Sequence, residues 1–572
     1  MQEIKNNLYN AFDNVLSKDL GKTLLVLENG LKVSRESVLM QSARIANTLK
    51  SLNAKPGDRI SIQTEKVPDS IALYLACLRG GFVYHPLNPD YTQSEVSYFF
   101  EDADPAIIIC DPKNKEIYKT LFGLPKKIPI LTLSHQNQGS LIARSKSQST
   151  NYGTHVCGSD TLAALVYSSG TTGKPKGIML SHNNLVSNTE TLIKSWKLSA
   201  ADCLIHALPI FHVHGLFVAI NSSLLTGGSM IFLPHFDPKK VIDCIPQATV
   251  MMGVPTYYTR LLNAGQLSHS KCKNMRLFIS GSAPLSINTF NDFREATNHE
   301  IVERYGMTET LMNTSNPVDG RRKSGSVGLP LQGISIRISN PIKGIGELEI
   351  KGPNLCMGYW RKEADTKKSL TVDGFFKTGD QAREDADGYI AIVGRKTDLI
   401  ITGGLNVYPV EVEKVINDIK GVLECSIVGI PDDDFGEGAK YLIRGQDIIL
   451  ITTGFMTQRA LDISLKLKEH GLNVGVVDIS RIKPLNEKLL ASVLSDAKIV
   501  YTLEEHSIIG GLGTSISELI SDHGIDVKLN RISLPDKQIF DYGDRDWLHS
   551  LYGLDKDSLV KSLLTIKGSS PK

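Results

Sequence analysis

Short apolar runs alternate with helical patterns through most of this chain, and this rhythm restricts it to an α/β architecture. A short strand pattern at Arg59 to Gln63 precedes an apolar helical pattern that begins at Ser70, and an apolar run follows at Ala106 to Cys110. Strands of a parallel sheet are buried on both faces, so they read as continuous apolar runs. The same rhythm recurs at 162–167, 230–233, 249–253 and 275–280. We therefore expect a large α/β body.

The rhythm changes twice farther along the chain. Around Glu347, short strands and Gly turns replace the strand–helix alternation, which predicts a small β-rich subdomain that closes the body. A helix over Pro409 to Ile419 and a strand over Cys425 to Gly429 begin another small unit, which stops before the alternation restarts at Asp447. These changes predict an N-terminal body over 1–394, a truncated small domain, or lid, over 395–445 and a further α/β domain over 446–572.

Length and charge set broad limits. At 572 residues the chain is too long for one hydrophobic core. Its 63 basic and 61 acidic side chains leave a net charge of +2, so we expect neither nucleic acid nor a membrane as a partner. No apolar run approaches the roughly 20 residues that span a bilayer, and the start lacks a leader pattern, which favours a cytoplasmic protein. The eight cysteines form no Cys-x-x-Cys pair, and the polar stretch 134–152 is expected to be an exposed loop.

A loop rich in glycine and hydroxyl groups follows the apolar run that ends at Tyr167. It reads Ser-Ser-Gly-Thr-Thr-Gly-Lys-Pro-Lys-Gly from Ser168 to Gly177. Glycines let the backbone approach a ligand closely, while hydroxyl donors and lysine charge suit a polyphosphate. The candidate ligands are Ser168, Ser169, Thr171, Thr172, Lys174 and Lys176. The Walker spacing is absent, and a plain Gly- and Ser-rich surface loop is the alternative.

This loop resembles the signature of the adenylate-forming superfamily, which comprises acyl-CoA synthetases, luciferases and peptide-synthetase adenylation domains. Four further segments resemble the family's other motifs and follow in the family's order, at 280–285, 303–309, 378–380 and 394–398. The resemblance implies an enzyme that activates a carboxylic acid with ATP and Mg²⁺ as an acyl-adenylate and then transfers the acyl group to a thiol. Attack of a carboxylate on the α-phosphorus brings two anions together, so such a site must supply compensating positive charge.

The resemblance also implies roles for the nucleotide-binding residues. Tyr305 would lie against the adenine base, and Thr308 would contact the phosphate. Glu309 would hold Mg²⁺. Asp380 would bind both ribose hydroxyls, with Arg395 as its ribose partner.

The acyl and thiol sites follow from the same resemblance. Gly281 and Ser282 belong to the adenine and acyl pocket, and His212 resembles a gate beside the acyl carbonyl. Lys176 joins His212, Thr308 and Glu309 as an expected catalytic group. The pair Gly403-Gly404 resembles the segment that lines a pantetheine tunnel after the small domain rotates, which favours CoA or a phosphopantetheine carrier protein as acceptor; a plain Gly-Gly turn is the alternative.

Three segments, 303–320, 63–70 and 87–91, look closer to malonyl-CoA synthetases than to long-chain or aryl ligases. A dicarboxylic acid needs a cation for its second carboxyl group. Three arginines are candidates, each of which could equally be a solvated helix residue: Arg260, Arg294 and Arg304. The expected substrate is a small, malonate-like carboxylic acid.

The chain departs from the family in its last third. Thr397 stands where relatives usually carry an Asp or Lys hinge, and the Pro-Arg-Thr-x-x-Gly-Lys run that ends the family's small domain is absent. The lysine of that run bridges the acyl carboxylate and the α-phosphate. Losing one such donor typically costs on the order of 10² to 10³ in rate, so adenylation is expected to be impaired. Other cations that could replace it are Lys174, Lys176 and Lys440.

The segment that replaces the missing end resembles the C-terminal domain of transketolases and related thiamine-diphosphate enzymes. The resemblance rests on 453–461, 482–486 and 503–513. It implies a homodimer formed through this tail and, as an alternative function, a third-domain subunit that assembles with transketolase-type thiamine-diphosphate subunits while the ligase-like body binds an acyl thioester or adenylate. A catalytically dead fusion is a further alternative. The glycines of 510–513 could mark a phosphate site, but a tight strand-to-helix turn is favoured.

Overall fold

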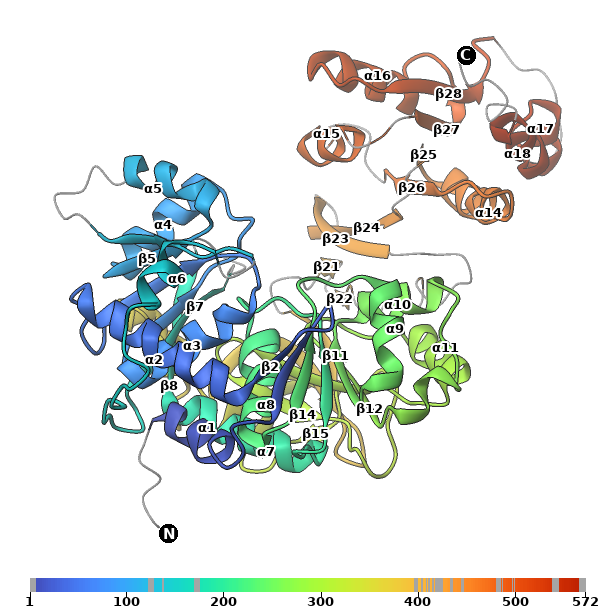
Figure 1. Ribbon diagram of the computed structural model, residues 1–572. Helices are drawn as coiled ribbons and strands as arrows, with labels where there is room; N and C mark the ends of the chain where they lie inside the picture. The colour runs from blue at the N-terminus through green and yellow to red at the C-terminus, as the bar shows by residue number, and fades with distance from the viewer. Residues whose placement is uncertain are drawn as a thin grey trace. The chain divides into compact units, whose positions relative to one another are not determined.

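The computed structural model describes residues 7–564 except 122–127, 136–137, 169–174, 396–399, several positions between 403 and 446, a few between 480 and 498, and 538–544. The chain divides into two units, Met1–Ile392 and Val393–Lys572. Figure 1 shows the described helices and strands of both, coloured along the chain. The first unit is the expected α/β body with its β-rich subdomain.

One sheet of the body has nine described strands in the order β15-β14-β13-β12-β11-β9-β10-β1-β2. The strands are β1 (Thr23–Leu27), β2 (Lys32–Ser34), β9 (Cys203–His206), β10 (Ser229–Phe232), β11 (Val250–Gly253), β12 (Leu277–Ser280), β13 (Val302–Met307), β14 (Leu311–Ser315) and β15 (Leu329–Pro330). Its centre is parallel. Alternate residues of these strands enter two different hydrophobic clusters, as Met251 and Met252 do, because successive side chains point to opposite faces.

Helices cover both faces of this sheet. On one face lie α9 (Pro238–Cys244), α10 (Pro255–Asn263) and α11 (Ile287–Thr297). Helices α1 (Leu8–Leu16), α7 (His182–Trp196) and α8 (Asn221–Thr226) contribute to the cluster on the other face, together with the π-helical segment η2 (His214–Ile220).

A second sheet has the described order β18-β8-β7-β4-β3-β5-β6. Its strands are β3 (Arg59–Gln63), β4 (Val83–Pro86), β5 (Ile107–Cys110), β6 (Ile130–Thr132), β7 (Leu162–Ser168), β8 (Lys176–Ser181) and β18 (Gly358–Tyr359). Helix α2 (Arg35–Ser51) precedes β3 along the chain, α4 (Gln93–Ala103) lies between β4 and β5, and α5 (Lys115–Leu121) lies between β5 and β6. Strands β7 and β8 form an antiparallel hairpin, and this hairpin carries the glycine-rich loop.

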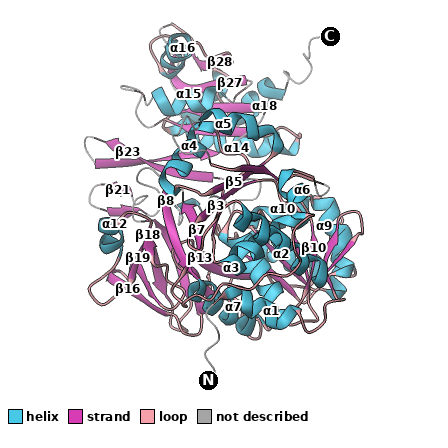
Figure 2. Ribbon diagram, turned by 60° about the vertical axis from the view of Figure 1, so that its left-hand side comes forward, coloured by secondary structure: helices cyan, strands magenta, loops and turns pink. Residues whose placement is uncertain are grey.

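Helix α3 (Pro68–Gly80) is buried over nearly its whole length. It begins with Pro68 at its first position, where a missing N–H costs nothing. It ends at Gly81, whose φ of +71° suits glycine. Figure 2 shows the strands of the body in magenta with the helices around them in cyan.

The predicted β-rich subdomain is a four-stranded sheet in the order β16-β17-β19-β20. It consists of β16 (Ser335–Ile342), β17 (Ile345–Lys351), β19 (Phe376–Glu384) and β20 (Ile390–Arg395). Helix α12 (Glu363–Ser369) follows β18 in the chain. Gly turns at Gly344 and Gly388 have positive φ, as the short-strand pattern requires.

The second unit contains a sheet in the order β22-β21-β24-β26-β25-β27-β28, with β23 paired to β24. Its strands are β21 (Ile400–Thr402), β22 (Leu405–Val407), β23 (Cys425–Asp432), β24 (Gly436–Ile443), β25 (Ile448–Thr452), β26 (Val474–Asp478), β27 (Ile499–Ser507) and β28 (Lys528–Leu534). Strand β24 pairs with both β23 and β26, so strands from before and after residue 446 share one sheet. The boundary placed there from the sequence stays a prediction.

Both faces of this sheet are covered, as the unbroken apolar run at 448–451 predicts. Ile448 and Leu450 belong to one cluster with α14 (Phe455–Glu469) and α18 (Lys556–Leu564). Ile449 and Ile451 belong to another cluster, with α15 (Glu487–Ser495) and α16 (Leu512–Asp522). Strand β28, α17 (Arg545–Leu551) and α18 complete the described part and were not predicted from the sequence.

The prediction of an exposed loop over 134–152 is wrong in part. Helix α6 (Ser140–Ser145) lies within it, and its Leu141 and Ile142 are buried. Gly139 precedes the helix with a φ of +116°, and a Cβ there would collide with the backbone of Thr132. Two apolar residues in a polar stretch were enough to anchor a short helix.

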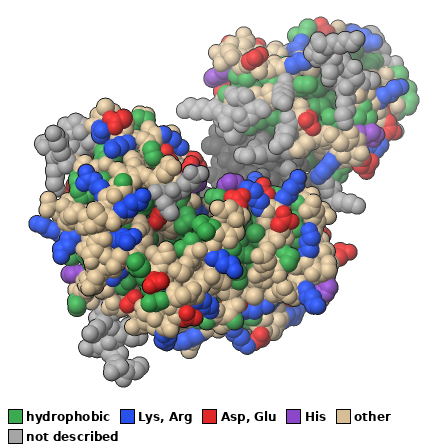
Figure 3. Space-filling view, viewed as in Figure 1, with side chains coloured by type: hydrophobic (Ala, Val, Ile, Leu, Met, Phe, Trp, Pro, Cys, Tyr) green, Lys and Arg blue, Asp and Glu red, His purple; other side chains and the backbone are tan. Residues whose placement is uncertain are grey.

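Charges of both signs are interspersed on the face of the body shown in Figure 3, in keeping with the small net charge. Within the described part of the chain, every helix is too short or too polar to cross a bilayer.

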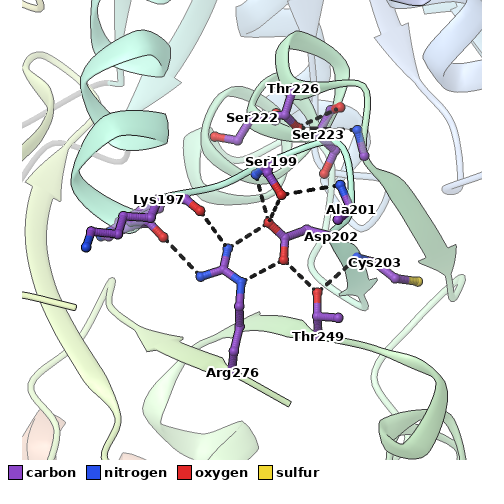
Figure 4. A network of polar contacts seen from close by, with 12 residues as sticks. Lys197, Ser199, Ala201, Asp202, Cys203, Ser222, Ser223, Thr226, Thr249 and Arg276 are labelled. Carbon is purple, nitrogen blue, oxygen red and sulfur yellow. Dashed lines mark hydrogen bonds and ion pairs between the residues drawn. The ribbon is translucent and has the colours of Figure 1, made fainter. Parts of the chain in front are cut away.

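A largely buried ion pair joins the end of α7 to the nine-stranded sheet (Figure 4). Arg276 donates from Nε and Nη2 to the two carboxylate oxygens of Asp202, each at 2.7 Å. It also donates to the backbone carbonyls of Trp196 and Lys197 at the end of α7. Thr249 donates to Asp202 at 2.8 Å. One guanidinium thus ties together a helix end, a loop and a strand.

Replacing Arg276 with Ala is expected to lower the free energy of unfolding by about 2 kcal/mol, because a largely buried carboxylate and two carbonyls lose their donor. Burial alone would raise the pKa of Asp202, but hydrogen bonds from Arg276 and Thr249 outweigh it and leave the pKa below its ordinary value. The deficit is therefore complete at neutral pH and shrinks as the pH falls through the folded-state pKa. Urea unfolding at pH 7 and pH 3 measures this, with the exposed Arg294→Ala as control; equal stability of the two variants at pH 7 would contradict it.

Candidate active site

The glycine-rich loop is held at both ends by the β7–β8 hairpin. Ser168 at the end of β7 pairs with Lys176 at the start of β8. Tyr98 donates to the carbonyl of Pro175 at 2.6 Å and so fixes the returning end. The intervening loop, with the predicted ligands Ser169, Thr171 and Thr172, lies outside the described residues. A hairpin of this kind brings both ends of a ligand-binding loop to one edge of the sheet.

Lys176 is the described cation of this loop. Its Nζ forms an ion pair with Asp365 on α12 at 3.2 Å. The same Nζ lies 5.0 Å from the centre of the Tyr359 ring. Both side chains of the ion pair are about one third exposed, so the pair lies at the surface, where an anionic ligand can compete with Asp365 for Lys176.

The predicted phosphate and metal residues lie in the turn between β13 and β14. Thr308 and Glu309 stand between Met307 and Leu311, which face each other in the hairpin. Leu311 has a φ of +50°, a left-handed conformation that is costly for leucine and typical of functional turns. Glu309 is only 8% exposed. A buried carboxylate of this kind fits Mg²⁺, which proteins usually hold through one or two carboxylates together with substrate phosphates.

The residues expected to contact adenine and ribose meet in the structure. Tyr305 on β13 donates its hydroxyl hydrogen to Asp380 on β19. Thr378 supports this carboxylate by accepting from the Asp380 amide at 3.0 Å while donating to Leu348 of β17 at 2.7 Å. Burial and the Asp380 charge hold the pKa of Tyr305 well above its ordinary value, so the phenol remains a donor. Strand β13 and the Thr378–Asp380 segment of β19, which lie far apart in sequence, are thus in direct contact through polar side chains.

A buried basic cluster lies beneath the turn at Gly281 and Ser282. Arg304 on β13 is 2% exposed, and its Nε and Nη2 have no hydrogen-bond partner among the described residues. A Cβ at Gly281 would collide with the Arg304 guanidinium and displace it, so the glycine leaves room for this guanidinium. Burial lowers the pKa of Arg304 to about 10, which leaves it charged at neutral pH. A buried charge with unpaired donors is costly unless an anion binds it.

His214 joins this cluster from η2. Its Nδ1 lies 3.4 Å from the hydroxyl of Ser282, and its Nε2 has no partner in the described part of the chain. Ser282 has a φ of +72°, a strained conformation for serine. Burial, and then the charge of Arg304, lowers the pKa of His214, so the imidazole is neutral. The hydroxyl of Ser280 on β12 is likewise buried and without a partner among the residues described.

The structure separates the three candidate arginines. Arg260 is exposed on α10. Arg294 is 52% exposed on α11 and pairs with Glu300 at 3.5 Å. Arg304 alone of the three is buried, on a strand rather than a helix, beside the Gly281 turn. Arg260 and Arg294 are solvated helix residues, which is the alternative that the sequence allowed for each of them.

The roles of all the predicted site residues stay predictions, including those of the residues whose positions are described above. His212 is exposed, two residues before the buried His214, and its role as a gate stays a prediction. Arg395 ends β20 and belongs to the second unit, so its role as a ribose partner also stays a prediction. Gly403 and Gly404, like Thr397, lie outside the described residues.

Three residues of the site were missed by sequence reasoning. His214 was overlooked in favour of His212, although an imidazole two residues away could equally face inward. Tyr359 follows Glu309 by 50 positions, and Asp365 lies farther still. Only the pairing of β18 with β8 brings this segment to the loop, and neither residue belongs to a local pattern that would mark it.

In the second unit, a buried carboxylate already binds the backbone amides of the glycine turn at 510–513. The fully buried Glu504 accepts hydrogen bonds from the amides of Leu512 at 2.7 Å and Gly513 at 2.8 Å. A Cβ at Gly511 would collide with this carboxylate. A phosphate placed at these amides would meet a carboxylate, so the geometry favours the tight-turn interpretation.

Comparison with known proteins agrees with this geometry. Residues 12–360 match the AMP-binding enzyme family, and these residues are more than half of the chain. The chain belongs to the AMP-binding enzyme family. Residues 437–559 match the transketolase C-terminal domain, and this match begins within β24. The AMP-binding enzyme thus carries a transketolase C-terminal domain, as expected from its sequence.

Relatives of this AMP-binding enzyme include CoA ligases, which makes it an acid–thiol ligase of that family. It is 33% identical over 415 residues to the malonate–CoA ligase of Arabidopsis thaliana, covering 68% of each chain. The ATP-bound crystal structure of MatB from Rhodopseudomonas palustris is 42% identical, with a TM-score of 0.75 and coverage of 83% of this chain and 95% of that one. The o-succinylbenzoate CoA synthetase of Bacillus subtilis with ATP and magnesium is 25% identical, covering 76% and 88%, with a TM-score of 0.66.

Proposed function

We propose that this enzyme activates a small malonate-like dicarboxylic acid with ATP and transfers the acyl group to CoA. The observation that carries the proposal is the buried Arg304, whose charged guanidinium lies beside the turn at Gly281 and Ser282. Two nitrogens of this guanidinium lack a hydrogen-bond partner among the described residues. Similarity to the malonate–CoA ligase of Arabidopsis thaliana supports the same substrate class. A phosphopantetheine carrier protein is an alternative acceptor.

Arg304 would bind the carboxylate that does not react. Its planar fork suits bidentate recognition of a carboxylate, and the burial of the site strengthens the interaction. The neutral Nε2 of His214 and the hydroxyls of Ser280 and Ser282 supply further hydrogen-bonding groups. A monocarboxylic acid would leave the guanidinium unpaired.

The other carboxylate would attack the α-phosphorus of ATP. Thr308, Glu309 and Lys176 are the groups that would surround the phosphates, and Tyr305 and Asp380 would hold the adenosine. When bound at Glu309, Mg²⁺ supplies positive charge that neutralises the phosphates as the bond to diphosphate breaks. Lys176 adds a second positive charge, provided that it leaves Asp365.

Replacing Asp380 with Ala is expected to weaken binding of a non-hydrolysable ATP analogue at least ~10-fold, because two ribose hydroxyls lose a charged acceptor. Isothermal calorimetry with Mg²⁺ measures this. Asp387→Ala removes an exposed carboxylate that pairs with Lys323, and it serves as the matched control. An absence of binding by the unaltered enzyme at millimolar analogue would refute the ligase function itself.

The transketolase C-terminal domain favours a second candidate function. In it, the second unit forms a homodimer and joins thiamine-diphosphate subunits supplied by other chains, while the body binds an acyl thioester or adenylate. One measurement distinguishes the two functions, namely AMP release by the purified enzyme. Only the ligase releases AMP from ATP, acid and CoA with no other protein present. The catalytically dead fusion would show neither AMP release nor assembly.

A further inference from the structure

Tyr359 stands between Glu309, in the turn after β13, and Lys176, at the returning end of the glycine-rich loop. Its hydroxyl donates to Oε1 of Glu309 at 3.2 Å. Its ring lies beneath Nζ of Lys176, 5.0 Å from the ring centre. One side chain therefore touches the two groups on which the positive charge around the phosphates depends.

The backbone holds Tyr359 firmly. Tyr359 pairs with Ile178 of β8, two residues beyond Lys176. Its amide donates to the hydroxyl of Thr366 on α12 at 2.9 Å. Gly358 has a φ of +126°, and a Cβ there would collide with Thr366, so the close packing of β18 on α12 needs glycine. The strand is also fastened to the loop end, because the amide of Trp360 donates to the carbonyl of Gly177 at 2.7 Å.

The phenol of Tyr359 acts as a hydrogen-bond donor to the Glu309 carboxylate. A phenol is a weak acid that keeps its proton at neutral pH. Tyr359 donates this proton in its hydrogen bond to Glu309. A phenol that donates to one carboxylate oxygen orients the carboxylate without neutralising its charge.

The ion-pair partner of Lys176 belongs to the same segment as Tyr359. Asp365 lies in α12, and the next residue along this helix is Thr366, which accepts from the Tyr359 amide. An ion pair with a carboxylate and an ion pair with a phosphate compete for the same ammonium group. One short segment therefore carries both the residue that contacts Glu309 and the carboxylate that holds Lys176.

We propose that Tyr359 is a positioning residue for nucleotide binding, which orients the Glu309 carboxylate toward Mg²⁺ and holds Lys176 beside it, with Asp365 as the counter-ion that an ATP phosphate displaces from Lys176. The proposal rests on the proposed function only for its ligand, ATP with Mg²⁺, and not for the identity of the acid.

Tyr359→Phe tests the hydroxyl and keeps the ring. It is expected to weaken Mg²⁺-dependent binding of a non-hydrolysable ATP analogue about 10-fold, to leave binding without Mg²⁺ unchanged, and to keep the melting temperature. Calorimetric titrations over a range of Mg²⁺ concentrations measure this. Tyr98→Phe is the matched control, because it loses a phenol bond to the same loop, at Pro175, away from Glu309. Its effect is expected to be independent of Mg²⁺.

Asp365→Asn tests the counter-ion. It is expected to tighten analogue binding about 5-fold, and this gain is expected to vanish when Lys176 is replaced with Met, because the two effects act through one ion pair. Unchanged Mg²⁺ dependence in Tyr359→Phe, or unchanged or weaker binding in Asp365→Asn, would overturn the proposal. An enzyme that binds the analogue but activates no dicarboxylic acid would refute the proposed function and leave this test intact.

Discussion

Replacing Arg304 with Met is expected to lower kcat/KM for malonate by about 10²- to 10³-fold, because the second carboxylate loses two charged hydrogen bonds in a buried site. Acetate has no second carboxylate, so its much slower reaction is expected to change little or to improve. Initial rates of AMP release with malonate, methylmalonate and acetate measure the change in preference.

Two controls separate recognition from folding. Arg260→Met and Arg294→Met remove exposed arginines of the same region and are expected to leave the preference intact. The melting temperature of Arg304→Met is expected not to fall, since an unpaired buried charge is replaced by an apolar chain of similar length. A parallel loss with malonate and acetate would show that Arg304 supports the site without reading the acid.

The two half-reactions are expected to be unequal, with adenylation slower than thiol transfer by about 10²- to 10³-fold. The Pro-Arg-Thr-x-x-Gly-Lys run, whose lysine the family resemblance assigns to adenylation, is absent from the sequence, and one preorganised donor at a developing charge is typically worth this much. Single-turnover rates from ATP and malonate, compared with the rate at which supplied malonyl-adenylate reacts with CoA, measure the difference.

Equal rates would mean that another cation replaces the missing lysine. Lys174, Lys176 and Lys440 are the candidates, and each replaced singly with Met would identify it. Of these, Lys176 is paired with Asp365, so its charge reaches a phosphate only by exchanging one anion for another. A Lys176→Met variant that slows adenylation alone would therefore point to this exchange.

Elements with strong local signals were predicted well. The strand Ile448–Thr452 begins with an unbroken apolar run, which is the pattern of a sheet covered on both sides. The strand Arg59–Gln63 was predicted from its place before the apolar helix in the strand–helix–strand rhythm. Helix α6 was missed because its apolar pair, Leu141 and Ile142, is too short to show a period. The sharing of one sheet by β24 and β26 could not be predicted, since edge pairing depends on backbone groups that every residue carries.

The sequence by itself determined the family, because a motif keeps its residue types and spacing along the chain. The phosphate loop and the roles of Tyr305, Glu309 and Asp380 stay predictions from the same motifs. Only the tertiary structure showed that Arg304 alone of the three arginines is buried, since burial depends on what packs around a side chain. It also placed Tyr359 beside Glu309 and Asp365 beside Lys176. Contacts between segments far apart in sequence have no local period, so no pattern along the chain could reveal them.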